Sequence, residues 1–71
     1  MIDRESVSST NVASIGYDNA TETLEVEFLN GGIYQYYNVS GELYEQFRAA
    51  GSKGQFLARY IKNAYPYSRV G

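Results

Sequence analysis

The sequence predicts an α+β domain in which a three-stranded antiparallel β-meander is followed by two α-helices packed on one face, in the order βββαα. Up to Val39, short runs of alternating apolar and polar residues are separated by turn residues, which is typical of antiparallel strands. From Ser40 onward the apolar residues recur three and four positions apart, as in a helix. The chain has only 71 residues, so we expect one domain spanning residues 1–71.

Three segments are expected to form the strands. Asn11–Tyr17 alternates, Leu24–Phe28 alternates without exception, and Ile33–Val39 is rich in tyrosine and branched residues. In the second segment the apolar residues lie on one face, and Glu25 and Glu27 lie on the other. A strand of this kind is half-buried, so we expect both carboxylates to be solvated.

The loop Asn30–Gly32 sets the pairing of the second and third strands, because a shift of one residue reverses every side chain. A two-residue loop would bury Gln35. A three-residue loop with Gly32 in the left-handed position would set Tyr34 opposite Phe28 and leave no lone amide inside. We therefore prefer the three-residue loop.

This register places Tyr36 opposite Val26. Tyr34 and Tyr36 are then predicted to be mainly packing residues of the core, whose phenol oxygens need partners or water at the rim. Tyr37 falls on the outer face.

Helix signals begin at Ser40, a good N-cap, and the first helix is expected to end at Gly51. Ser52 is expected to cap a second amphipathic helix, which Pro66 terminates, and the tail that follows should fold back as an ordered segment. The expected apolar stripes are Leu43, Tyr44, Phe47 and Ala50, then Phe56, Leu57, Tyr60, Ile61 and Ala64, with Gln55, Arg59 and Lys62 facing away from the second stripe.

Charge is distributed unevenly along the chain, whose net charge is −2. Residues 1–47 contain all eight acidic side chains and a single basic one, Arg4. The basic residues of the second half have no acidic neighbours in that half; they are Arg48, Lys53, Arg59, Lys62 and Arg69. This pattern indicates either an anionic partner for the second half or mutual attraction of the two halves in the fold.

Catalysis is not expected, because the chain contains no histidine and no cysteine. The same absence argues against a metal site, and no motif indicates a cofactor. The N-terminus has charges and hydroxyls where a signal peptide would be apolar, and no run approaches bilayer length. We therefore expect a cytoplasmic protein that does not enter the membrane.

An ordered set of short motifs resembles the KTSC domain, over a core of about residues 7–70. Its parts are Val7-Ser8-Ser9, Ile15–Asp18, Leu24–Phe28, Tyr34-Gln35-Tyr36, Val39, Ser52-Lys53-Gly54, Ile61 and Tyr65-Pro66-Tyr67. The family's central Tyr-x-Tyr motif matches Tyr34 and Tyr36. Ser40 stands where many members have proline, and Leu57-Ala58 stands where an asparagine is common.

The resemblance implies a small domain of unknown function that also occurs at the C-terminus of some lysyl-tRNA synthetases and as stand-alone bacterial and phage proteins. RNA binding has been proposed for this family because of the synthetase fusion.

Three functions remain open. The first is a non-catalytic binding module for an unidentified protein partner. The second is an RNA- or tRNA-binding domain that uses the five basic residues of the second half together with Tyr37, Tyr65 and Tyr67 as stacking residues. The third is an anion site at Ser52, Lys53 and Gly54, where helix capping and close packing are the alternative account.

Overall fold

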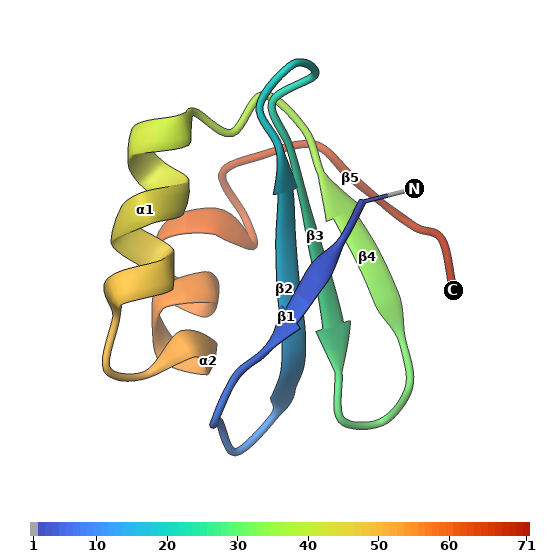
Figure 1. The fold of residues 1–71 in the computed structure, drawn as a ribbon, viewed down its shortest axis with the longest axis vertical. Helices are drawn as coiled ribbons and strands as arrows, with labels where there is room; N and C mark the ends of the chain where they lie inside the picture. The colour runs from blue at the N-terminus through green and yellow to red at the C-terminus, as the bar shows by residue number, and fades with distance from the viewer. Residues whose placement is uncertain (1) are drawn as a thin grey trace.

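The computed structural model describes residues 2–71 and has one antiparallel sheet with the helices on one of its faces (Figure 1). The predicted α+β class and the placement of two helices on one face are confirmed. The predicted number of three strands is wrong, because the sheet has five strands in the order β1-β2-β3-β4-β5. The strands are β1 (Arg4–Ser6), β2 (Val12–Asp18), β3 (Thr23–Phe28), β4 (Ile33–Tyr36) and β5 (Tyr67–Arg69).

The two additional strands lie at the edges of the sheet. β1 pairs with β2, and β5 pairs with β4, each over three residues. Neither segment has the alternation that marks a half-buried strand, and both owe their strand geometry to backbone pairing with a neighbour. The tail that was expected to fold back as an ordered segment does so as β5.

Both predicted helix caps are confirmed. Helix α1 (Gly41–Ala49) begins where the Ser40 hydroxyl accepts a hydrogen bond from the Leu43 N–H, 3.1 Å. Helix α2 (Lys53–Phe56) begins where the Ser52 hydroxyl accepts one from the Gln55 N–H, 3.3 Å. None of the helices within residues 2–71 has the length and apolar character needed to cross a membrane.

The second helix differs from the single amphipathic helix that was predicted. After α2 the chain continues as a π-helix, η1 (Leu57–Ile61), in which the Lys62 N–H donates to the Leu57 carbonyl at 2.8 Å. Its wider turn, with bonds between residues five apart, changes which side chains lie on one face of the helix. Leu57 and Ile61 are buried as expected, but Tyr60 is 51% exposed and Ala64 is also exposed, so the predicted stripe is wrong at these two positions.

The hairpin between β3 and β4 has the predicted three-residue loop, but the loop begins one residue earlier. The Phe28 N–H donates to the Gly32 carbonyl at 2.8 Å, and the Gly31 N–H donates to the Phe28 carbonyl at 2.9 Å. Gly31, with φ of 96°, occupies the left-handed position that was assigned to Gly32.

The register of β3 and β4 is consequently two residues from the predicted one. Tyr34 pairs with Val26 and not with Phe28, and Tyr36 pairs with Leu24. Because side chains alternate with a period of two, this shift leaves every residue on the predicted face. Tyr36 is a core residue, and Tyr34 is partly buried against the core.

The core lies between the sheet and the helices, and its fully buried large side chains come from β2, β3, the segment between β4 and α1, and the helical region. They are Val12, Ile15, Leu24, Val26, Val39, Phe47 and Ile61.

On the outer face of the sheet, the prediction that Glu25 is solvated is wrong. Glu25 is 3% exposed and not solvated, because β1 brings Arg4 into an ion pair with its carboxylate. Gln35 Nε2 donates to the other carboxylate oxygen at 2.9 Å.

Candidate binding groove

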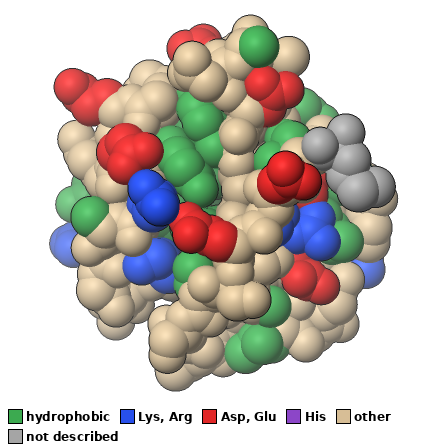
Figure 2. All heavy atoms as spheres, in the orientation of Figure 1, with side chains coloured by type: hydrophobic (Ala, Val, Ile, Leu, Met, Phe, Trp, Pro, Cys, Tyr) green, Lys and Arg blue, Asp and Glu red, His purple; other side chains and the backbone are tan. Residues whose placement is uncertain are grey.

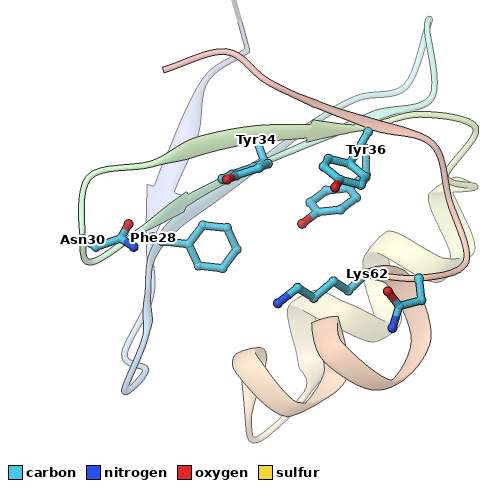
Figure 3. Close-up of a pocket in the computed structure, with 7 residues that line it drawn as sticks. Phe28, Asn30, Tyr34, Tyr36 and Lys62 are labelled. Carbon is cyan, nitrogen blue, oxygen red and sulfur yellow. The ribbon is translucent and has the colours of Figure 1, made fainter.

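Between β4, β5 and the end of η1 lies a cavity of about 290 Å³, which we call the aromatic groove. Figure 3 shows the rings of Phe28, Tyr34 and Tyr36 on the sheet side, with the Lys62 side chain extending from the helical side toward them. The residues that line it are Phe28, Asn30, Tyr34, Tyr36, Lys62, Asn63 and Tyr67.

The aromatic walls support one another through ring contacts. The Phe28 and Tyr34 centroids are 5.7 Å apart in an edge-to-face arrangement with an interplanar angle of 82°. Tyr67 lies 6.0 Å from Tyr34 and 5.7 Å from Tyr36. The Arg69 guanidinium lies over the Tyr34 ring, 5.9 Å from its centroid. These contacts orient the rings relative to one another.

Burial differs strongly among the three tyrosines. Tyr36 is 2% exposed, Tyr34 is half-buried and Tyr67 is 58% exposed. Burial raises the pKa of the Tyr36 phenol above its ordinary value of 10.0, and the neighbouring Tyr34 and Tyr67 raise it further. The Tyr36 hydroxyl is therefore protonated at neutral pH, where it can both donate and accept a hydrogen bond.

The polar groups at the groove are basic or neutral. Lys62 follows directly on the π-helix, and the carboxamides of Asn30 and Asn63 complete the lining. No acidic side chain of residues 2–71 lines the cavity. The arrangement can hold an apolar or flat group against the rings and an anionic group at Lys62.

Three of the residues predicted to bind a partner meet at this groove. Lys62 and Tyr67 line it, and Arg69 covers one of its rings. Arg48 lies away from the groove, where its Nε donates a hydrogen bond of 2.7 Å to Glu5 of β1. That hydrogen bond raises the pKa of Arg48 above its ordinary value.

The remaining predicted residues are dispersed over the molecule. Tyr37 lies on the outer face, as expected, and its hydroxyl bonds to Gln35 and Ser68. Tyr65 is partly buried against the core, and Arg59 lines a separate shallow depression. The eight candidates therefore do not form one continuous surface.

At the predicted anion site, capping and packing account for all three residues. Ser52 caps α2, and the Lys53 ammonium donates to the Ala50 carbonyl at 2.6 Å. A Cβ on Gly54 would overlap the Asn11 side chain, so glycine permits this close approach.

The charge pattern has an intramolecular explanation at Arg48, since this residue of the basic half pairs with Glu5 of the acidic half. Figure 2 shows acidic and basic side chains interspersed on one face of the molecule, with no separate acidic and basic fields there. This arrangement agrees with the alternative in which the two halves attract each other.

Some lining residues had no signal in the sequence. Asn30 and Asn63 belong to a hairpin loop and to the segment after η1, and nothing in their local pattern relates them. Phe28 was expected only as a core residue. Its position at the end of β3, next to the hairpin, makes it a groove wall.

The fold defines a small α+β domain with a five-stranded meander and two helical segments on one face. The family model described as the KTSC domain matches residues 8–65. The chain therefore belongs to the KTSC domain family, as the motifs of the sequence indicated.

Similar proteins include lysine–tRNA ligases, which are much longer than this chain, and proteins of about its own length. The chain spans about 10% of the length of the lysine–tRNA ligase of Trichormus variabilis, with 35% identity over 54 residues, which is 76% of this chain. An uncharacterised protein of Stutzerimonas stutzeri is 34% identical and is matched along almost its whole length, over 94% of this chain and 96% of that protein. The crystal structure of a KTSC domain protein from Yersinia pestis has a TM-score of 0.95 and 37% identity, with both chains covered completely.

Proposed function

We propose that this KTSC domain is a non-catalytic binding module that holds a segment of a partner protein in the aromatic groove. The observation that carries the proposal is the convergence of four aromatic side chains with Lys62 around one cavity. Tyrosine and arginine are over-represented among the residues that dominate the energy of protein interfaces, and here Arg69 lies over Tyr34 beside the groove.

The openness of the groove favours a polypeptide over an enclosed small molecule. Tyr67, on the edge strand, is largely exposed, so the groove continues onto the surface of β5. The groups that line it supply rings, amides and one ammonium, which suit recognition, and no His, Cys, Ser, Asp or Glu side chain of residues 2–71 is among them.

A photo-crosslinking amino acid placed at position 67 of the full chain tests the proposal. The matched control is position 60, because Tyr60 is a similarly exposed tyrosine outside the groove. We expect a protein adduct at position 67 and not at position 60, followed by saturable binding of the purified partner. That binding should weaken more than tenfold in Tyr67→Ala and remain unchanged in Tyr60→Ala. Adducts formed equally at both positions would contradict the proposal.

RNA is the second candidate, because similar segments occur in lysine–tRNA ligases and because Tyr67 and Lys62 can stack on a base and pair with a phosphate. Among the basic side chains of residues 2–71, the groove brings Lys62 and Arg69 to such a ligand. If these two form the phosphate contacts, the logarithm of affinity for single-stranded RNA should fall against the logarithm of salt with a slope of about −1.4. Titration of the labelled domain with bulk tRNA and a short single strand at several salt concentrations decides this, and salt-independent binding would exclude it.

Anion binding at Ser52, Lys53 and Gly54 is the third candidate. It predicts amide shifts confined to these residues when inorganic phosphate is added. Because Lys53 already bonds to Ala50, we expect only small shifts there.

A further inference from the structure

We infer that the partner segment binds as an extended acidic strand that adds to the free edge of β5. This inference rests on the proposed role of the domain as a protein-binding module. It specifies the conformation and the charge of the segment that occupies the aromatic groove.

The edge of β5 is open along its whole length. β5 is the last strand of the sheet, and all three of its residues are exposed (Figure 1). Beyond β5, the part of the chain that the structure describes contributes no further strand to this edge. An exposed edge strand offers unpaired backbone groups to an extended peptide.

The hydrogen bonds to β4 show which backbone groups of β5 face outward. The Tyr37 N–H donates to the Pro66 carbonyl, and the Val70 N–H donates to the Ile33 carbonyl, both at 2.8 Å. Residues 66 and 70 therefore direct these groups toward β4. By the alternation of an antiparallel ladder, residue 68 does the same, and the N–H and C=O groups of residues 67 and 69 point toward the open edge.

The side chains of the same two residues lie on the groove side of the sheet. Tyr67 pairs with Tyr36, and Arg69 pairs with Tyr34, whose rings line the cavity. A strand added to β5 would thus direct every second side chain beside Tyr67 and Arg69. Backbone pairing would give affinity, and these side-chain contacts would give specificity.

The positive charge at the groove indicates that the partner segment is acidic. The groove has Lys62 in its wall and Arg69 beside it, and no acidic side chain of residues 2–71 lines the cavity. An aspartate or glutamate at one of the inward positions would pair with these cations. A basic segment would be repelled.

The opposite edge of the sheet is less suitable for such an addition. β1 carries Arg4 and Glu5, and Arg48 of α1 pairs with Glu5 there. Charged residues on an edge strand are a common protection against pairing with another chain. β5 has the single charged residue Arg69 and two uncharged residues, so it is the more accessible edge.

Panning the full chain against a phage-displayed library of random peptides, followed by NMR titration with the synthetic copy of an enriched peptide, tests the inference. We expect peptides with alternating apolar residues and at least one Asp or Glu, and with no central proline. Binding should slow solvent exchange of the Tyr67 and Arg69 amides at least tenfold. Methylation of the peptide amides that face β5 should abolish binding, and methylation of the alternate amides should not.

Two variants at one position separate the backbone from the side chain. Arg69→Ala removes the guanidinium and its contacts with Tyr34 and the Gly71 carbonyl, whereas Arg69→Pro removes these and also an outward N–H, without breaking a bond to β4. We expect Arg69→Pro to bind about tenfold more weakly than Arg69→Ala, the effect of one lost hydrogen bond. Amide spectra of both free variants establish that β5 is still paired, and equal affinities of the two variants would overturn strand addition.

The outcomes distinguish this inference from the proposed function. Proline-rich peptides, or peptides that shift the groove resonances without protecting the Tyr67 and Arg69 amides, would overturn strand addition and leave the groove as a protein-binding site. Absence of any enriched peptide, or binding that avoids the groove, would overturn both. Self-association of the chain through β5 would also overturn the acidic partner proposed here.

Discussion

Arg4 of β1 reaches across β2 to form an ion pair with the buried carboxylate of Glu25 on β3. The residue between them in the register is Gly16, which pairs with both. Because glycine has no side chain, nothing on β2 separates the guanidinium from the carboxylate. This contact joins an edge strand that has little apolar surface of its own to the centre of the sheet.

Replacement of Gly16 by alanine should therefore loosen β1. A Cβ at this position would overlap the Asp3 carbonyl and the Ile2 side chain, and backbone cannot move aside as a flexible side chain can. We expect a loss of about 1–3 kcal/mol in the free energy of unfolding, measured by urea denaturation. Gly51→Ala is the matched control, since a Cβ there meets nothing within 4 Å. Equal stabilities of the two variants would refute this account of Gly16.

The ion pair itself can be measured by a double-mutant cycle of Arg4→Met and Glu25→Gln. Arg4 also donates to the Ser14 hydroxyl at 3.0 Å, and Glu25 accepts from Gln35, so each single change removes one charge from a connected network. Because the carboxylate is buried, we expect a coupling of about 1–3 kcal/mol between the two changes in urea denaturation. If the effects of the two changes on the free energy of unfolding add to within about 0.5 kcal/mol, the ion pair makes no specific contribution to stability.

The sequence predicted the central strands, both helix caps and the inward faces, because each depends on neighbours in the chain. Ser40 and Ser52 stand directly before helical patterns, and the alternation of residues 24–28 marks a strand whose apolar residues face inward. The exact hairpin register was missed because consecutive glycines, Gly31 and Gly32, can both supply the left-handed residue.

The edge strands and the groove could not be predicted, because they arise from contacts between distant segments. Arg4 forms part of a strand through its pairing partner Gly16 and its contact with Glu25. Lys62 reaches the groove after a π-helical turn that has no recognised local signature. The basic character of Lys62 and Arg69 was evident from the sequence, but their convergence on the tyrosine rings was not.

Alkaline pH should destabilise the fold partly through Tyr36. Burial raises the pKa of its phenol in the folded state above the ordinary value of 10.0, so its stabilising effect is complete below pH 10 and is lost as the pH rises through the folded-state pKa. One such group contributes a slope of at most about 1.4 kcal/mol per pH unit. Urea denaturation from pH 8 to pH 11 should show a smaller alkaline loss for Tyr36→Phe than for the wild type. Parallel profiles for the two proteins would contradict this effect of burial.

Tyr36 and Tyr67 should have separable roles in stability and binding, although both line the aromatic groove. Tyr36 is buried in the core. Its replacement by alanine should lower the free energy of unfolding by about 3–5 kcal/mol, the usual range for a large aromatic residue. Tyr67 is largely exposed on an edge strand, so Tyr67→Ala should cost less than about 1 kcal/mol while weakening partner binding more than tenfold.

Urea denaturation and a binding titration of the same preparations measure the two effects. Tyr60→Ala is the control for removal of an exposed ring, because Tyr60 lies outside the groove. A Tyr67→Ala variant as unstable as Tyr36→Ala would assign Tyr67 to the core, because its ring contacts with Tyr34 and Tyr36 would then be essential to folding. A stable Tyr67→Ala variant with unchanged binding would remove Tyr67 from the site and leave its exposure without a role in recognition.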